Sequence, residues 1–288
     1  MRGEVPAYEM RTPQTLNEAL ETLAKEPGAW KIFAGGTDLM VSFESGKLDH
    51  KKFLNINALP ELKEILSNEE DVLIGATCTY DQIQNHPLIK KEFPLLAQAA
   101  KLTGAVAIQN RGTLGGNIAN MSPAADSPPA LLAYDADIIL NSTKGYRVLS
   151  YKYFHQAYKK SDLRPHELIM ALRLKREQKF THEYYRKVGT RSAQAISKVC
   201  FAAVAAVGRG QKIEWIRIGL GSVGPVPLRP VRTELFLSQK DLSPATLQEA
   251  KKLLLSEITP IDDIRSEALY RREVTGNLLT EFLEKLKT

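Results

Sequence analysis

The chain of 288 residues is 43% hydrophobic and 25% charged, a globular composition that excludes extensive disorder and allows two or three lobes. Its two cysteines, Cys78 and Cys200, exclude a disulfide scaffold and any four-cysteine zinc or iron–sulfur site within this chain. The net charge of +6 comes mainly from residues 180–288, where 17 Lys and Arg oppose 12 Asp and Glu. These cations are scattered, so a solvated surface is favoured over an acidic partner or a phosphate-bearing ligand, and nucleic acid is not expected.

The ends of the chain and its apolar runs bear on where the protein resides. The opening MRGEVPAYEMRTP has no apolar stretch, so we expect no secretory signal. The tidy apolar run at residues 201–207 is far shorter than the roughly 20 residues that cross a bilayer. A cytoplasmic location without membrane contact is therefore expected.

In chain order, the first segment predicts a small α/β lobe. Thr15 and Glu18 have the spacing of a capping box that opens an amphipathic helix through about residue 25. A short strand follows at 30–34, and Gly35 and Gly36 make an abrupt turn into the next segment. Another short strand is predicted at 53–56.

Two further lobes follow. The first contains strands at 71–76, 136–140, 146–150 and 168–174 and helices at 79–85 and 93–103, with residues 104–129 as its least regular part. The last contains strands at 184–188, 199–207 and 212–220, predicted to form an antiparallel sheet, and helices at 246–258 and 267–286.

One glycine pattern resembles a dinucleotide fingerprint but lacks its context. Gly219, Gly221 and Gly224 satisfy G-x-G-x-x-G after a predicted strand. A dinucleotide site needs a helix to open there, whereas prolines at 225, 227 and 230 push the chain out of helical conformation. We therefore do not expect a Rossmann site.

The common catalytic templates are also missing. The five histidines form no H-E-x-x-H motif, and there is neither a G-x-S-x-G elbow nor a Walker phosphate loop. Cys78 and Cys200 are expected to be small buried residues rather than nucleophiles. The sequence therefore predicts no catalytic residue and no metal site in this chain.

Two glycine-rich loops carry the informative chemistry. The first runs from Ile32 to Leu39, and the second is N-R-G-T-L-G-G-N-I-A-N at 110–120. Adjacent glycines let the backbone approach a phosphate, and successive N–H groups can converge on it. Downstream, Asp126 precedes a predicted helix. Its spacing favours a helix cap over a carboxylate that binds a ribose.

At these residues the sequence resembles the FAD-binding medium subunit of molybdenum hydroxylases, the family of xanthine dehydrogenase and the aerobic carbon monoxide dehydrogenases. The resemblance covers essentially the whole chain, including A-G-G-T-D-L at 34–39, T-L-G-G-N-I-A-N at 113–120 and S-P-A-A-D at 122–126. It implies an α+β fold with an FAD-binding domain of the vanillyl-alcohol-oxidase type at 1–178, whose lobes are about 1–56 and 57–178. Residues 179–288 then resemble the carbon monoxide dehydrogenase flavoprotein C-terminal domain.

The resemblance also implies the residues that bind FAD. Asp126 would bind the ribityl or ribose region, against the cap interpretation, while Ile169 and Lys187 would approach the flavin and Thr103 would make a weaker contact. The two loops would hold the diphosphate and adjoining parts through Ile32, Phe33, Ala34, Gly35, Gly36, Thr37, Asp38, Leu39, Thr113, Leu114, Gly115, Gly116 and Asn117. Gln109 stands where many members carry arginine, so that charge is missing here.

The implied function is electron transfer within a complex. A large molybdopterin-binding subunit and a small [2Fe-2S] subunit would be the partners, and FAD in this chain would pass electrons to NAD, a quinone or oxygen. Two cysteines disfavour the subclass that carries an extra iron–sulfur cluster in this subunit. A stand-alone flavin oxidoreductase and a non-catalytic nucleotide-binding assembly module are the alternatives.

Overall fold

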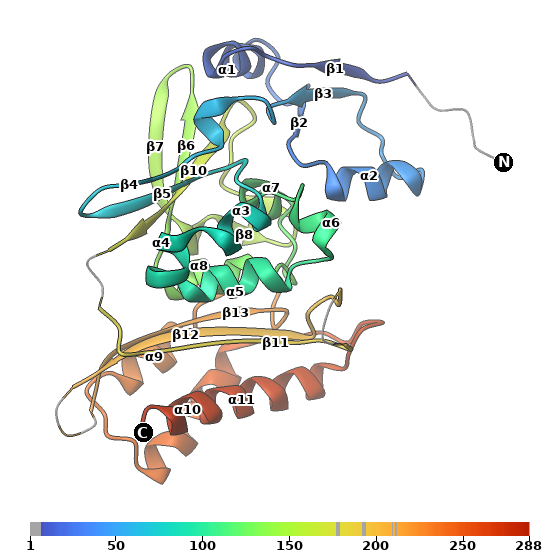
Figure 1. The fold of residues 1–288 in the computed structure, drawn as a ribbon. Coiled ribbons are helices and arrows are strands. Elements are labelled where there is room, and N and C mark those ends of the chain that lie inside the picture. Colours follow the sequence, from blue (N-terminus) through green and yellow to red (C-terminus); the bar gives the residue numbers. More distant parts are fainter. Residues whose placement is uncertain (1–6, 177–178, 192–193, 209, 211, 288) are drawn as a thin grey trace.

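The computed structural model describes residues 7–176, 179–191, 194–208, 210 and 212–287, which stack as three lobes (Figure 1). The N-terminal lobe lies at one end, the middle lobe in the centre, and the C-terminal lobe at the other end. Sheets and helices segregate within each lobe, which confirms the predicted α+β class. The predicted domain boundary at 178 falls at residues 177–178, outside the described part of the chain.

The N-terminal lobe is a small parallel sheet in the order β1-β3-β2, with a core of Leu20, Leu23 and Leu54. Its elements are β1 (Glu9–Arg11), α1 (Leu16–Lys25), β2 (Lys31–Phe33), α2 (Thr37–Glu44) and β3 (Lys52–Asn55). The Thr15 hydroxyl caps α1 by accepting a hydrogen bond from the Glu18 amide at 3.2 Å. The Glu18 carboxylate instead accepts from the amide of Gln14 at 2.7 Å, so the predicted box closes one residue earlier.

The middle lobe contains an antiparallel sheet in the order β4-β5-β10-β6-β7, flanked by short helices (Figure 1). Its strands are β4 (Ile65–Ser67), β5 (Asp71–Gly75), β6 (Asp137–Ser142), β7 (Gly145–Ser150) and β10 (Leu168–Lys175), with β8 (His155–Ala157) and β9 (Lys160–Ser161) as a separate hairpin. Its helices are η1 (Pro60–Leu62), α3 (Tyr80–Asn85), α4 (Pro87–Glu92), α5 (Pro94–Leu102), α6 (Val106–Gln109), α7 (Leu114–Ala119), α8 (Ser127–Ala133) and η2 (Tyr151–Tyr153).

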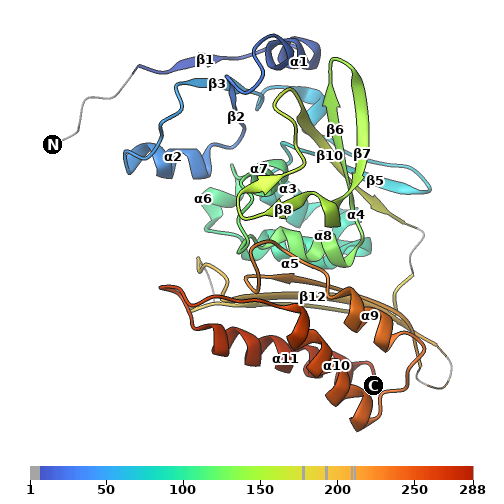
Figure 2. The same ribbon diagram turned by 180° about the vertical axis from the view of Figure 1, so that it is seen from behind.

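The C-terminal lobe contains the predicted antiparallel sheet, in the order β11-β12-β13, with helices on both of its faces (Figure 2). The strands are β11 (His182–Val188), β12 (Val199–Val207) and β13 (Ile213–Gly221), and the helices are α9 (Val231–Leu237), α10 (Pro244–Glu257) and α11 (Ala268–Lys285). Helices α5 and α8 of the middle lobe cover one face, while α10 and α11 lie against the other. This double cover explains the continuous apolar run of β12, which is buried from Val199 to Ala206.

The fingerprint-like glycines at the end of β13 have a packing role. A Cβ on Gly219 would lie 2.0 Å from the carbonyl oxygen of Pro129, so only glycine lets β13 approach α8 this closely. The next helix, α9, does not begin until Val231. The geometry therefore agrees with the prediction that this motif is not a dinucleotide site.

The segment 104–129, predicted to be irregular, contains α6, α7 and the start of α8. The strands β1, β4, β8 and β9 were also not predicted, because two or three residues carry no readable periodicity.

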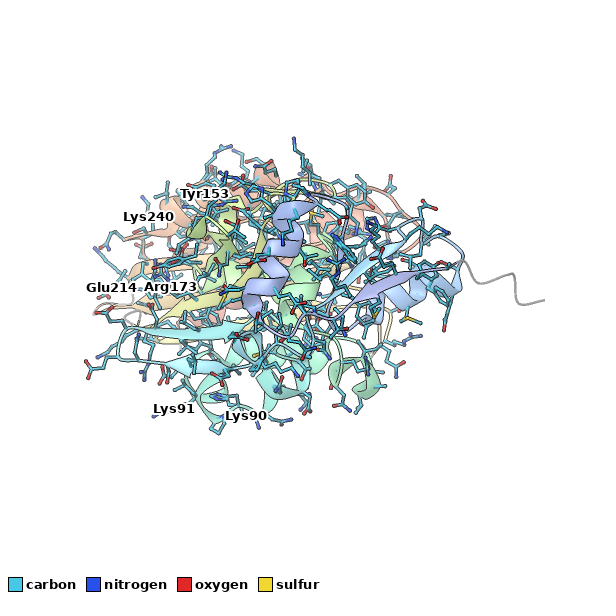
Figure 3. The ribbon with its side chains drawn as sticks, turned by 90° about the horizontal axis from the view of Figure 1, so that it is seen from above. Lys90, Lys91, Tyr153, Arg173, Glu214 and Lys240 are labelled. Carbon is cyan, nitrogen blue, oxygen red and sulfur yellow. The ribbon has the colours of Figure 1, made fainter. Side chains whose placement is uncertain are left out.

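Among the described residues, no helix is both long and apolar enough to cross a membrane. Lys90, Lys91 and Lys240 are exposed, and Figure 3 shows Lys90 and Lys91 together at one edge of the molecule and Lys240 at another.

Candidate functional site

A cavity of about 1030 Å³ lies between the N-terminal and middle lobes, and both glycine-rich loops line it. This volume is at the upper end of the range for small-molecule and cofactor sites. Of the positions predicted from the sequence, those that line the cavity are Ile32, Ala34, Gly35, Gly36, Thr37, Asp38, Leu39, Thr103, Thr113, Gly115, Gly116, Asn117 and Ile169. The fold therefore gathers residues that lie more than 100 positions apart in the sequence.

The two loops touch one another directly. A Cβ on Gly35 would lie 1.8 Å from the carbonyl oxygen of Arg111, so the loops meet at backbone distance. The Arg111 Nε donates to the Gly35 carbonyl at 3.5 Å, and the Asn120 amide donates to the Asp38 carboxylate at 3.1 Å. The absence of a side chain at Gly35 is thus what lets both loops form one wall.

The first loop presents the start of a helix to the cavity. Gly36 has a φ of +74°, a left-handed conformation that favours glycine, and it precedes α2. The first intrahelical bond runs from the Met40 amide to the Gly36 carbonyl at 2.8 Å, so the amides of Thr37, Asp38 and Leu39 precede the hydrogen-bonded part of the helix. Such N–H groups, at the positive end of the helix dipole, suit an anion.

The second loop contributes differently from the prediction. Its amides at Leu114 and Gly115 donate to the carbonyls of Cys78 and Ala76 at 3.0 and 2.8 Å, and the Gly116 amide donates to the Thr113 hydroxyl at 3.2 Å. Because these N–H groups bind within the protein, they do not converge on a phosphate here. The second loop instead lines the cavity with the backbone of its glycines and with the side chain of Asn117.

Asn117 carries an unsatisfied acceptor in this wall. Its Oδ1 is buried and finds no hydrogen-bond donor among the described residues. A buried acceptor without a partner costs free energy unless a ligand supplies the donor. A ribose or ribityl hydroxyl has the required chemistry.

Four predicted residues lie outside the cavity wall. Phe33 packs its ring beneath Gly36, where a Cβ would lie 2.5 Å from the ring, and Leu114 belongs to the core of the middle lobe. Asp126 and Lys187 form a buried ion pair behind Thr103, with Nζ and Oδ2 2.6 Å apart. The Lys187 ammonium also donates to the Leu102 carbonyl at 2.8 Å, which places the pair next to the wall.

Asp126 does not cap helix α8, so the cap interpretation is wrong. Its side chain makes no cap hydrogen bond and instead accepts from the Ser197 hydroxyl at 2.6 Å and from Lys187. Burial raises the pKa of this carboxyl, against the opposing effects of Lys187 and Ser197. Asp126 therefore joins the middle lobe to the C-terminal lobe through an ion pair that sits beside the cavity.

Other wall residues were missed by sequence reasoning, among them Trp30, Tyr80, Lys159 and Glu167. None of these stands in a motif that could have singled it out. Gln109, the expected departure, is buried and donates to the Lys101 carbonyl at 2.8 Å, so here its amide holds α6 against α5. The position thus has a structural role in this chain.

Neither of the two cysteines lines the cavity. Both cysteines are buried, and burial raises the pKa of the Cys78 thiol to about 11. A thiol with that pKa is a poor nucleophile at neutral pH. Among the described residues, no cluster of three His, Cys, Asp or Glu side chains is arranged to hold a metal ion.

Glu167 supports one side of the cavity through Arg147, whose Nε and Nη2 donate to its two carboxylate oxygens at 2.7 and 2.9 Å. Burial acts to raise the pKa of Glu167, but Arg147 and the Arg164 amide together outweigh it, and the net pKa is lowered. The Glu167–Arg147 pair therefore stabilises the folded protein at pH values above the ordinary Glu pKa of about 4.3. This stabilisation is lost as the pH falls through the lowered pKa that Glu167 has in the folded protein.

We expect Glu167→Gln to weaken the protein at neutral pH and to flatten the acid side of its stability profile. Unfolding midpoints measured between pH 3 and pH 7 check this result. Glu21→Gln, which removes an exposed carboxylate on α1, is the control and should leave the profile unchanged. A Glu167→Gln profile parallel to the unaltered protein would contradict the assignment.

Comparison with known proteins agrees with this geometry. Residues 6–174 match the family described as FAD binding domain in molybdopterin dehydrogenase, and residues 183–286 match the CO dehydrogenase flavoprotein C-terminal domain. The carbon monoxide dehydrogenase medium chain of Hydrogenophaga pseudoflava is 27% identical over 278 residues, or 96% of each chain. The nicotinate dehydrogenase FAD-subunit of Eubacterium barkeri is 28% identical over an alignment of 290 positions that covers 97% of each chain.

A solved structure extends the likeness to the fold. It is that of carbon monoxide dehydrogenase from Hydrogenophaga pseudoflava lacking the Mo-pyranopterin moiety of its molybdenum cofactor. The TM-score is 0.92 at 27% identity, covering 98% of this chain and 97% of that one. The resemblance read from the two loops is therefore confirmed along the chain.

Proposed function

Because this chain belongs to the family of FAD-binding domains of molybdopterin dehydrogenases, we propose that it is the FAD-binding medium subunit of a molybdenum hydroxylase complex. It takes electrons from [2Fe-2S] centres of a small partner subunit to FAD and passes them to NAD or another acceptor. The observation that carries the proposal is the direct contact of the two glycine loops around one cavity.

The residues present fit FAD. The first turn of α2 offers amides of Thr37, Asp38 and Leu39 for the diphosphate, and Gly116 of the second loop projects no side chain into the cavity. Asn117 offers its unpartnered Oδ1 to a hydroxyl of the ribityl chain or ribose. The apolar side chains of Ile32 and Ile169 give the flat rings a surface to contact.

FAD accepts electrons one at a time and can deliver a pair, which suits a junction between iron–sulfur centres and a hydride acceptor. The chain's own part is to bind, to orient and to set the electrostatic surroundings. We assign the electrostatic role to Lys187. Its ammonium donates to the carbonyl of Leu102, the residue just before Thr103 of the cavity wall.

Two partners follow from the proposal: a large molybdopterin-binding subunit and a small [2Fe-2S] subunit. The relatives support this by name, since one is a medium chain and another is an FAD-subunit. This chain, with two buried cysteines, has no cysteine set for a cluster of its own.

Purification tests the proposal against its alternatives. The chain should be yellow, its flavin should be reduced by dithionite, and molybdenum- and iron-containing polypeptides should co-purify from its native source. Turnover of a substrate by the isolated chain would favour a stand-alone oxidoreductase. A colourless protein that refuses added FAD would contradict flavin binding altogether.

We expect Lys187→Gln to lower the midpoint potential of bound FAD by roughly 30 mV or more, because it removes a cation and leaves the Asp126 carboxylate beside the flavin site. FAD affinity should change much less. Potentiometric titration of the FAD-loaded chain measures the effect, and exposed Lys90→Gln on α4 is the control. An unchanged potential in Lys187→Gln would remove Lys187 from this role.

A further inference from the structure

A lysine at the tip of the β8–β9 hairpin connects separate parts of the cavity wall. Lys159 lines the cavity, and its Nζ donates to the carbonyl oxygen of Asn120 at 2.5 Å and to the Asn120 Oδ1 at 3.1 Å. A protonated amine that donates to a carbonyl makes a charge-assisted bond, which is stronger than a neutral one. The hairpin is thereby fastened to the end of α7.

The connection continues to the other glycine loop. Asn120 follows α7 directly, and its Nδ2 donates to the Asp38 carboxylate in the first turn of α2 at 3.1 Å. Asn120 thus uses its carbonyl groups toward Lys159 and its amide toward Asp38. We call Lys159, Asn120 and Asp38 the wall bridge, because together they join the hairpin, the second loop and the first loop.

The backbone at Lys159 strengthens the case for a role beyond the turn. Its φ is +55°, in the left-handed region where glycine or asparagine is favoured and a lysine carries strain. The hairpin is only a few residues long, so a glycine would form the turn more easily. At this position the Lys159 ammonium reaches both oxygens of Asn120.

We propose that Lys159 is a positioning residue that holds the wall of the cavity closed on the FAD diphosphate and so sets how long FAD stays bound. This inference rests on the proposed function. In the wall bridge, Lys159 holds Asn120 from the hairpin side while Asn120 holds Asp38 of the first loop, so Lys159 fixes the residue that joins the two loops. The ammonium also adds a positive charge to a wall that faces a dianionic diphosphate.

The test is the rate at which FAD leaves the holoprotein. Lys159→Gln removes the charge, and we expect FAD dissociation, followed by flavin fluorescence after dilution, to be about tenfold faster. Lys160→Gln, at the adjacent exposed position, is the matched control and should leave the rate unchanged. Lys159→Arg keeps a cationic donor and should restore the rate to within a few-fold.

A further variant separates cofactor retention from folding. Lys159→Asn relieves backbone strain, because asparagine tolerates the left-handed region. The unfolding midpoint of the FAD-free variant should therefore equal or exceed that of the unaltered protein. FAD should still dissociate faster from this variant than from the unaltered protein. A lower midpoint in this variant would assign Lys159 to the fold and overturn the proposal. Equal dissociation rates for Lys159→Gln and the unaltered protein would also overturn it. If the unaltered chain takes up no FAD, the proposed function itself fails.

Discussion

Replacing Gly35 with alanine is expected to weaken FAD binding at least 100-fold, about 2.7 kcal/mol. The added Cβ would lie 1.8 Å from the carbonyl oxygen of Arg111 and 3.2 Å from the Cα of Gly112, and neither backbone atom can rotate away. The two loops must therefore separate, and the amides of α2 lose their place beside the second loop. Fluorescence titration of the purified variant with FAD measures the loss.

Gly46→Ala is the control for this experiment. Gly46 lies just beyond α2, has a φ of +68° and has open space where a Cβ would project. Alanine there carries the backbone strain of a left-handed residue but no contact with the cavity, so FAD affinity should be unchanged. Equal affinity for Gly35→Ala and the unaltered chain, with both folded by circular dichroism, would contradict the loop assignment.

The second large effect is on stability. We expect Lys187→Gln to lower the free energy of unfolding by about 3–5 kcal/mol, because it leaves Asp126 as an uncompensated charge in a buried place. The Asp126 and Lys187 side chains are only 9% and 8% exposed, so solvent does little to offset the loss. Equilibrium unfolding in urea measures the change.

A double-mutant cycle isolates the pair. Asp126→Asn with Lys187→Gln should cost clearly less than the sum of the single changes, because no lone charge remains. Lys25→Gln is the control: its ion pair with Glu21 is exposed, and less than about 1 kcal/mol is expected. Additive effects at Asp126 and Lys187 would show that the two side chains do not depend on each other.

Much of the fold is readable from the sequence where local signals agree. The Thr79 hydroxyl accepts from the Gln82 amide, and Gln82 bonds back to the Thr79 amide, so the start of α3 is fixed within a few residues. The apolar run at 199–207 predicts a strand of an antiparallel sheet, and the structure has this strand as β12, buried along almost its whole length. The two loops stand out because adjacent glycines are rare outside turns and close backbone approaches.

What the sequence does not reveal depends on contacts between distant residues. The spacing of Asp126 before a helix favours a cap, but tertiary contacts with Lys187 and Ser197 take its carboxylate. Helix α7 is short and contains two glycines, so no periodicity predicts it, and it is held by hydrogen bonds to the carbonyls of Ala76 and Cys78. Lys159 stands in no motif and gains its place only when the hairpin folds against α7.

Every binding role assigned to this chain requires that the two glycine loops form a single FAD cleft. Calorimetric titration of the purified chain with FAD, and separately with FMN, tests it directly. We expect one equivalent of FAD to bind, and FMN to bind at least 100-fold more weakly, because FMN lacks the diphosphate and the adenosine that the cavity of about 1030 Å³ has room for. Absence of FAD binding, or equal affinity for both flavins, would contradict it.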